Sequence, residues 1–442
     1  MRGLLKRLLK DRKGNALVIA GAALPLIMGS AGLASDTIQW TMWKRQLQRA
    51  ADSAAMAGVY AHVAGKPVGT CTNWSSATYS DPVGYDLRNN NHLGIATTCV
   101  VENSPSSGSF SSDAHAVRVN LSAQKRLNFS SMFMTAPPTI SASATATVVP
   151  SGQYCVVSLE STATTGITAT GSANVDLGCG MITNSTSMTA AVATGSSQVN
   201  ASPIAAVGGI SASSNWGSST VLQPFTLAQE DPFANVPPPT FPTGNCPNVL
   251  VPTGTVVTLP TATATNTTGL PGNTYCIGNL TVRGNLTLPD GVYILDAGSI
   301  DFGSQSNVSC GHCTFVLSSR TAATNPGSIG NMNITAGAQL DLTSTNSGTY
   351  QGILVYQDRR AVNGTSANRQ SSVNGNANSI FAGAFYFPNQ QLTFNGTAGM
   401  TTDCMQLVAR TVLYSGNMEI SNTCDTDSGA SSFAGKKVRL VA

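Results

Sequence analysis

Residues 169–175 read ATGSANV, and the pattern returns 24 residues later at 193–199 as ATGSSQV. A shorter repeat, GNLT, occurs at 278–281 and again at 284–287. Offsets in the low twenties are typical of solenoids, in which each repeat forms one turn and buries its apolar face against its neighbours. The sequence therefore predicts a parallel β-helix-like solenoid. A β-sandwich of antiparallel hairpins is the alternative.

The composition of the 442-residue chain also favours strands. Apolar residues make up 41% of it and charged residues only 10%, and the apolar residues alternate with Thr and Ser over many short stretches. Disordered chains combine low hydrophobicity with high charge, which is a different composition. Beyond residue 13, 17 basic side chains are balanced by 19 acidic ones, so we expect no nucleic-acid partner for this nearly neutral body.

Residues 14–35 carry no charged side chain over 22 positions. As a helix with a rise of about 1.5 Å per residue, they span roughly 30 Å, the thickness of the hydrocarbon core of a bilayer. Six basic residues and one acidic residue precede the span, and their net charge of +5 predicts a cytoplasmic N-terminus and an exported body. A signal peptide cleaved near Ser35 is the alternative. The expected anchor residues are Leu17, Val18, Ile19, Leu24, Pro25, Leu26 and Ile27, with Trp40 and Trp43 at the membrane interface.

Helical spacing continues beyond the uncharged span, from Asp36 to about Ala64, and places small residues on one face. Small side chains allow a second helix or a sheet to approach closely. The spacing does not distinguish packing against a partner's helix from packing against the chain's own domain. The candidate packing residues are Leu47, Ala50, Ala54, Ala57, Gly58 and Ala61.

The chain divides by pattern into segments. Between 223 and 245, six prolines impose an extended backbone that is unsuited to a central strand, so we expect a Pro-rich strap across the surface. The predicted fold is mainly β, with disulfides bracing the solenoid. The expected segments are a cytoplasmic basic tail at 1–13, a transmembrane and membrane-proximal helix at 14–64, a small mixed α/β domain at 65–150, a first solenoid part at 151–222, the strap at 223–245 and a second solenoid part at 246–442.

Two stretches of the N-terminal region resemble a known family. DRKGNA at 11–16 and RQLQRAADSAAMAG at 45–58 are similar to the N-terminal module of TadG-like proteins, which belong to the tight-adherence (Tad, or Flp pilus) assembly machinery of bacteria. The resemblance implies a single-pass protein of the bacterial inner membrane with a periplasmic body, whose partners are the lipid bilayer and other Tad-type assembly proteins. Two features differ from relatives of this family. Ile19 stands where TadE-like pseudopilins carry Glu, and the Asp-x-Ser-x-Ser motif of von Willebrand-type domains does not occur.

Ten cysteines, an even number, predict disulfides in an exported chain. The sequence alone leaves their connectivity open. Cys155 and Cys179 are 24 residues apart, and Cys404 and Cys424 are 20 residues apart, which is close to one repeat. Parallel strands stacked about 4.8 Å apart would bring such cysteines within the roughly 4.4–6.8 Å between Cα atoms that a disulfide needs. Pairing in chain order gives Cys71–Cys99, Cys155–Cys179, Cys246–Cys276, Cys310–Cys313 and Cys404–Cys424.

Two features invite a chemical function. Residues 310–313 read CGHC, but their flanks are strand-like and no second pair of metal ligands follows, so we expect a structural disulfide rather than a redox or zinc site. Asp290, Asp296 and Asp301 fall within twelve residues and could serve a polysaccharide lyase or hydrolase. Solvated turn carboxylates are the simpler interpretation in a chain with 20 acidic residues. We expect no catalytic residue, no metal and no cofactor.

Together these features predict a non-enzymatic, membrane-anchored component of a Tad/Flp-type pilus or surface-assembly machinery. One alternative is a surface-polysaccharide-binding or -cleaving β-helix protein, for which the glycan is unknown. Another is an adhesin that is released from the membrane by cleavage near Ser35.

Overall fold

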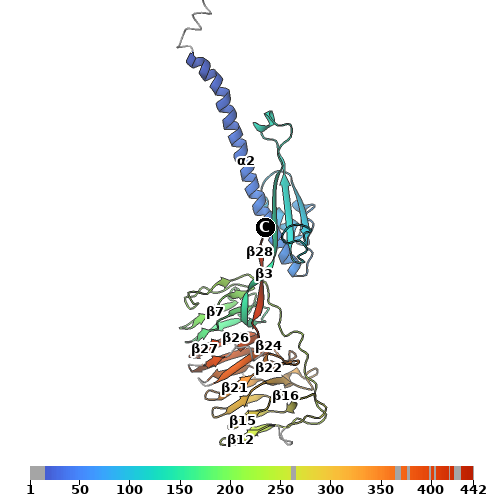
Figure 1. Ribbon diagram of the computed structural model, residues 1–442, viewed down its shortest axis with the longest axis vertical. Coiled ribbons are helices and arrows are strands. Elements are labelled where there is room, and N and C mark those ends of the chain that lie inside the picture. The colour runs from blue at the N-terminus through green and yellow to red at the C-terminus, as the bar shows by residue number, and fades with distance from the viewer. Residues whose placement is uncertain are drawn as a thin grey trace, which may run out of the picture. The chain divides into compact units, whose positions relative to one another are not determined.

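The computed structural model describes residues 15–259, 265–363, 370–375, 379–397, 400–402, 405–417, 419–422 and 430–441. The chain forms two compact units: unit 1 comprises Met1–Val149 and Val438–Ala442, and unit 2 comprises Pro150–Lys437. In the described residues the α-helices are α2 (Asn15–Val63) and α3 (Pro82–Asn90), both in unit 1. Strands dominate the rest, so the protein is mainly β with one long N-terminal apolar helix (Figure 1).

Unit 1 packs its helices against an antiparallel sheet. The sheet contains β1 (Thr97–Asn103), β2 (Val117–Ala123) and the first part of β3 (Ile140–Ser158). Along β2, buried and half-buried residues alternate, as expected for a sheet with one face on a core. Two 3-10 helices, η1 (Trp74–Ser76) and η2 (Ser130–Met132), lie in the connections. From the C-terminal end, Val438 and Leu440 of β28 (Phe433–Leu440) pack against the same core.

Unit 2 contains three parallel ladders, in which strands from successive repeats pair side by side (Figure 1). These parallel pairings differ from the antiparallel hairpins that the sandwich alternative requires. Ladder one runs through β13 (Thr274–Ile277), β16 (Gly291–Asp296), β19 (Cys313–Ser318), β22 (Ile353–Gln357), the middle of β24 (Ile380–Thr397), the first part of β26 (Met405–Asn417), the end of β3, β6 (Gly180–Thr183), β9 (Ile204–Ala206) and β10 (Leu222–Gln223).

The other two ladders use the remaining strands, and η3 (Pro326–Ser328) lies in a connection. Ladder two runs through β11 (Val249–Val251), β14 (Leu280–Val282), β17 (Ile300–Phe302), β20 (Met332–Ile334), β23 (Ser371–Gly375), the end of β24, the end of β26, β4 (Ile167–Ala169) and β7 (Ala191–Ala193). Ladder three contains β12 (Val256–Thr258), β15 (Asn285–Leu288), β18 (Asn307–Cys310), β21 (Gln339–Thr343), the start of β24 and, in a separate stretch, β25 (Met400–Thr402), β27 (Glu419–Asn422), β5 (Asn174–Asp176) and β8 (Gln198–Asn200).

The order of strands in the ladders differs from their order in the sequence. β26, which lies late in the chain, pairs in parallel with both β3 and β4. The strands from β3 to β10 therefore extend the ladders beyond β26. At the opposite end, the first strands of the three ladders among the described residues are β11, β12 and β13. The strands described within 151–222 and those from β11 to β27, predicted as two separate solenoid parts, belong to the same ladders, whereas Val438–Ala442 belong to unit 1. Each pairing satisfies backbone groups that would otherwise be open at a strand edge.

Residues 224–248, which we call the strap, connect β10 to β11 and so return the chain along the ladders. The strap begins one residue later than the sequence predicts, because Gln223 belongs to β10. Eight strand spacings separate β9 from β13 in ladder one, roughly 40 Å at about 4.8 Å each. The strap's 25 residues reach roughly 75 Å at about 3.1 Å per residue in an extended proline-rich conformation, so its length is ample.

Ladder one is buried on both faces because the strap covers its outer side. On the inner side, residues such as Tyr293 and Phe315 belong to the main core of unit 2. On the outer side, a second apolar cluster that includes Val316 packs against Phe233 and Val236 of the strap. Successive residues of these strands are accordingly buried, and β19 and β22 are buried along their whole length. In ladder three, β15 alternates between exposed and buried residues.

Candidate functional site

The first half of α2 presents an apolar surface that unit 1 leaves open. Leu26 is 75% exposed, and Ile19, Leu24 and Ile27 are exposed as well. Pro25 lies inside the helix without ending it, which is common in membrane helices. Leu17 and Val18 belong to α2, but their side chains lie outside the described set. By length and composition, Ile19–Val63 contains a stretch able to cross a membrane. One N-terminal apolar helix is therefore consistent with a single-pass anchor.

The second half of α2 is buried against its own unit. Leu47, Ala50 and Ala54 are fully buried in the core of unit 1, together with residues of α3 and the sheet. A Cβ added at Gly58 would lie 2.8 Å from Cγ1 of Val117 in β2. Of the remaining stripe residues, Ala61 is buried and Ala57 is half-buried.

This burial corresponds to the own-domain alternative that the spacing left open. Small residues at these positions let the sheet approach the helix closely, so the stripe has a sufficient structural reason within the chain. Packing of the stripe against a partner's helix stays a prediction. Trp43, predicted at a membrane interface, is buried within unit 1, whereas Trp40 is half-buried.

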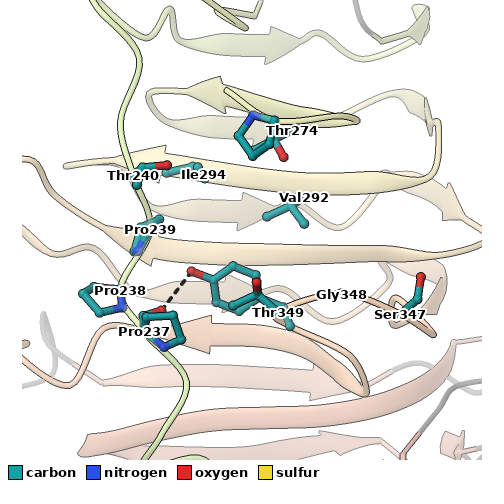
Figure 2. Close-up of a pocket in the computed structure, with 12 residues that line it drawn as sticks. Pro237, Pro238, Pro239, Thr240, Thr274, Val292, Ile294, Ser347, Gly348 and Thr349 are labelled. Carbon is teal, nitrogen blue, oxygen red and sulfur yellow. Dashed lines mark hydrogen bonds between the residues drawn. The ribbon is translucent and has the colours of Figure 1, made fainter. Parts of the chain in front are cut away.

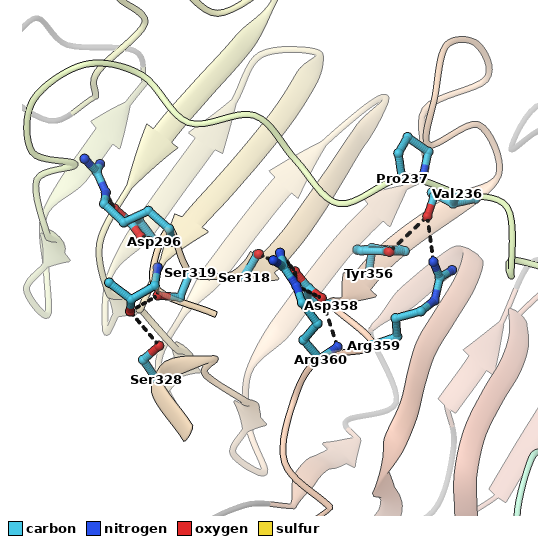
Figure 3. A network of polar contacts seen from close by, with 12 residues as sticks. Val236, Pro237, Asp296, Ser318, Ser319, Ser328, Tyr356, Asp358, Arg359 and Arg360 are labelled. Carbon is cyan, nitrogen blue, oxygen red and sulfur yellow. Dashed lines mark hydrogen bonds and ion pairs between the residues drawn. The ribbon is translucent and has the colours of Figure 1, made fainter. Parts of the chain in front are cut away.

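In unit 2 the strap is held by side-chain donors from ladder one and its adjoining turns (Figure 3). Proline has no N–H group, so a proline-rich backbone offers mainly carbonyl acceptors. The prolines predict the strap but not these donors, whose only signal in the sequence is a set of Tyr and Arg residues at the ends of apolar runs. Tyr350 donates to the carbonyl of Pro237 at 3.2 Å, and Tyr356 donates to that of Val236 at 3.2 Å. Arg359 donates to the carbonyls of Val236 at 3.2 Å and Phe233 at 2.6 Å, and Arg320 donates to that of Gly244 at 2.9 Å.

Further contacts hold the strap near its start. The side-chain amide of Asn184 donates to the Gln229 carbonyl at 2.8 Å and accepts from the Gln229 N–H at 2.7 Å. Tyr386 donates its hydroxyl to Asp231 at 2.7 Å, and its ring meets the Phe233 ring edge-on at 5.4 Å between centroids. The strap is therefore fixed at several successive strands of ladder one.

Burial and hydrogen bonding shift the pKa values of this network in different directions. Burial raises the pKa of Tyr356 to about 12. Burial also raises the pKa of Tyr386, and the hydrogen bond to Asp231 adds to the effect. For Asp358, burial opposes ionisation, but hydrogen bonds from Arg360 and Ser318 outweigh it and lower the pKa of that carboxyl below its ordinary value. The tyrosines are therefore neutral donors near neutral pH, and Asp358 is a buried anion paired with Arg360 (Figure 3).

A pocket of about 310 Å³ lies beside the strap (Figure 2). Its lining combines apolar surface with hydroxyl and backbone groups and includes no charged side chain. Such a lining suits a small neutral group. The lining residues are Pro237, Pro238, Pro239, Thr240, Pro271, Thr274, Val292, Ile294, Ser347, Gly348, Thr349 and Tyr350.

The three neighbouring aspartates singled out in the sequence do not converge on one site. Their partners lie 18 to 24 residues away in the sequence, about one repeat, so the carboxylates connect adjacent repeats of the ladders. Among the described residues, no group of three or more His, Cys, Asp or Glu is placed to hold a metal ion. The pairs are Asp290 accepting from the His312 backbone N–H at 2.9 Å, Asp296 with Arg320, and Asp301 with Arg283 at 2.5 Å.

The disulfides of the described residues follow the chain-order pairing, although the sequence alone leaves the connectivity open. Cys155–Cys179 connects adjacent strands of ladder one, where Tyr154 pairs with Gly180. Cys246–Cys276 joins the end of the strap to β13. Cys404 and Cys424 lie outside the described residues, so their bond stays a prediction. The bonds are Cys71–Cys99, Cys155–Cys179, Cys246–Cys276 and Cys310–Cys313.

Comparison with known families matches the N-terminal helix. Residues 14–61 match the family model described as "Putative Flp pilus-assembly TadE/G-like", which confirms the resemblance drawn from the sequence. The matched segment includes both the exposed apolar half of α2 and the buried stripe of its second half. Neither curated proteins nor solved structures give a significant match to the chain.

Proposed function

We propose that the protein is a non-enzymatic, membrane-anchored component of a Tad/Flp-type pilus or surface-assembly machinery. The observation that carries this proposal is the coincidence of the family match at 14–61 with a helix whose first half is apolar and exposed. A role for that module in assembly would require both the anchor and the folded helix–sheet unit beside it. Other proteins of the same machinery are the proposed partners.

The proposed location is the bacterial inner membrane, with the N-terminus in the cytoplasm and the chain beyond the span of α2 in the periplasm. The basic tail supports this orientation, since basic residues next to a span favour the cytoplasmic side. The disulfides support an oxidising compartment for the body. α2 continues through Ser35 as helix, which supports an anchor that is retained rather than cleaved there.

For unit 2 we propose a closed parallel β-solenoid that acts as a rigid periplasmic body. The support is the set of three parallel ladders with partners one repeat apart, together with a core between them. A stack of this kind is stiff because each strand is bonded on both sides. The separate partners of Asp290, Asp296 and Asp301 favour this structural role over a polysaccharide-cleaving one.

A complementation experiment in the bacterium that carries the gene tests this function. Deletion should abolish pilus assembly or adherence, and the full chain should restore it. A version in which a cleavable signal peptide replaces residues 1–35 should be exported but should fail to restore assembly. Full restoration by this released body would contradict an anchored role and favour the adhesin alternative.

A second set of variants tests the non-enzymatic part of the proposal. Asp290, Asp296 and Asp301 are changed together to Asn, and pilus assembly is compared at equal amounts of folded protein. We expect unchanged assembly, because these carboxylates connect repeats rather than act on a substrate. Loss of assembly with unchanged folding would favour the polysaccharide enzyme.

A further inference from the structure

The segment from Leu127 to Met134, which contains η2, carries large apolar side chains into solvent. Met132 is 75% exposed and Phe133 is 70% exposed, and Phe129 and Met134 are exposed as well. Four such side chains within six residues form a concentrated apolar surface, which soluble surfaces rarely display without a partner. We call residues 127–134 the apolar loop.

The apolar loop is attached to α2 at the end of the uncharged span. The Phe129 ring lies against Gly32, where an added Cβ would overlap it. The Ser130 backbone N–H donates to the buried carboxylate of Asp36, the first charged residue after the span, at 2.6 Å. Gly32 lies three residues before Ser35, about 5 Å inside the end of the span at the helical rise. Amphipathic segments bound at a membrane surface enter it to a similar depth, about 5–10 Å.

Successive backbone N–H groups of the apolar loop, those of residues 130–134, are hydrogen-bonded. Besides the Ser130 N–H, the N–H groups of residues 131–134 donate to carbonyls within the loop, over distances of 2.9 to 3.1 Å. Unpaired backbone donors are costly in a low-dielectric medium, so this compact turn is suited to one.

Basic side chains stand at the base of the apolar loop. Lys125 and Arg126 precede it directly and are both exposed. Arg126 also donates to the Thr135 carbonyl at 2.7 Å, which closes the base of the loop. Cations beside an apolar tip match the arrangement of a bilayer surface, where lipid phosphates lie above the acyl chains.

We propose that the apolar loop inserts into the surface of the bilayer that α2 crosses, giving unit 1 a second membrane contact. The inference rests on the proposed anchoring by α2. Phe129, Met132 and Phe133 enter the interfacial region, and Lys125 and Arg126 contact anionic headgroups. With α2 alone, unit 1 could rotate and tilt about one helix. The second contact fixes the orientation of unit 1 at the membrane surface.

Photolabelling of the full chain from within the bilayer tests this proposal. The protein is reconstituted in vesicles of phosphatidylethanolamine and phosphatidylglycerol that contain a phospholipid with a diazirine on its acyl chain. After irradiation, mass spectrometry locates the adducts. We expect adducts on residues 127–134 at a yield comparable to that on residues 19–28 of α2. The yield should exceed that at Met188, a 70% exposed residue of unit 2, by at least about tenfold.

Each pattern of adducts has a distinct meaning. Adducts on α2 without adducts on the apolar loop would overturn the inference and leave the anchor intact. The absence of adducts from both segments would overturn the anchor and the inference with it. Adducts on both segments support the two together.

A double variant, Met132→Asp with Phe133→Asp, provides a second measurement. The two carboxylates should withdraw the apolar loop from the bilayer and lower the adduct yield on Phe129 by about tenfold or more, while the yield on α2 stays unchanged. Met188→Asp is the matched control and should leave loop labelling as in the original chain. Undiminished labelling of Phe129 in the folded double variant would contradict insertion of the loop.

Discussion

Two regions of the protein carry large apolar surfaces, and they differ in how far other residues of the chain cover them. The outer face of ladder one is covered by the strap, which places Phe233 and Val236 on it and accepts hydrogen bonds from Tyr356 and Arg359. The first half of α2 has exposed apolar residues such as Leu26. Phe129 contacts this half of the helix at Gly32, but Leu26 and its neighbours stay exposed. An exposed apolar surface of this kind is consistent with the proposed single-pass anchor.

The largest expected effect comes from charges in the exposed region of α2. The double variant Leu26→Lys with Ile27→Lys should lose stable membrane integration, since each charge near the middle of a span costs about 2.5–3.5 kcal/mol. The fraction of protein that remains in membranes after alkaline carbonate extraction measures the effect. Val256→Lys, at an exposed position of unit 2, should remain in the membrane fraction. A double variant retained as fully as this control would break the distinction between the two surfaces.

A smaller effect is expected where the strap covers ladder one. Phe233→Ala removes ring contacts with Tyr386 and Phe433 and should destabilise unit 2 by about 2–3 kcal/mol, less than for a fully buried ring. Phe225→Ala, at an exposed position in the same strap, should change stability by less than about 0.5 kcal/mol. Thermal unfolding followed by circular dichroism compares the two. Equal effects would mean that the strap does not cover the ladder in the way described.

Within α2, two glycines sharpen the comparison between covered and exposed surface. Gly58→Ala should destabilise unit 1 by about 1–2 kcal/mol, because the new Cβ would lie 2.8 Å from Val117. Gly21→Ala meets nothing within 4 Å and should be neutral or stabilising by up to about 1 kcal/mol through helix propensity. Unfolding of the detergent-solubilised protein provides the measurement. If Gly58→Ala behaves like Gly21→Ala, the second half of α2 is not packed against the sheet.

The smallest effect concerns the hydroxyl groups under the strap. Because the pKa of Tyr356 is raised to about 12 in the folded protein, its contribution to stability is complete below the ordinary tyrosine pKa near 10 and declines as pH rises from about 10 towards 12. Tyr356→Phe should cost about 1 kcal/mol at neutral pH through the lost hydrogen bond to Val236. The variant should also show a smaller loss of stability between pH 10 and 12. An identical alkaline decline in both proteins would indicate that Tyr356 is not buried under the strap.

Much of the secondary structure was predictable because it depends on local pattern. The 24-residue repeat predicts partners one repeat apart, and the structure pairs Ile167–Ala169 with Ala191–Ala193 in parallel. The prolines of 223–245 predict a strap, since they cannot belong to a central strand. The mostly apolar stretch Cys313–Ser318 also carries a signal, the lack of alternation that is typical of a strand buried on both faces.

The remaining features depend on long-range choices that local pattern does not encode. Similar repeats fit one another in more than one order, so the pairing of β26 with β3 and β4 has no local signature. The small-residue stripe of α2 suits a partner's helix and the chain's own sheet equally well, and the structure places Gly58 against Val117. The contact of Phe129 and Ser130 with α2 joins residues almost a hundred positions apart, and the types of these residues do not predict it.

The central claim is that an uncleaved α2 anchors a body exported to an oxidising compartment. The intact mass of the protein, extracted from native membranes and treated with a thiol-alkylating reagent without reduction, tests both parts at once. The account predicts a chain that retains residues 14–35 and carries no alkylated cysteine. A mass that begins beyond Ser35, or alkylation of the cysteines in the body, would contradict it.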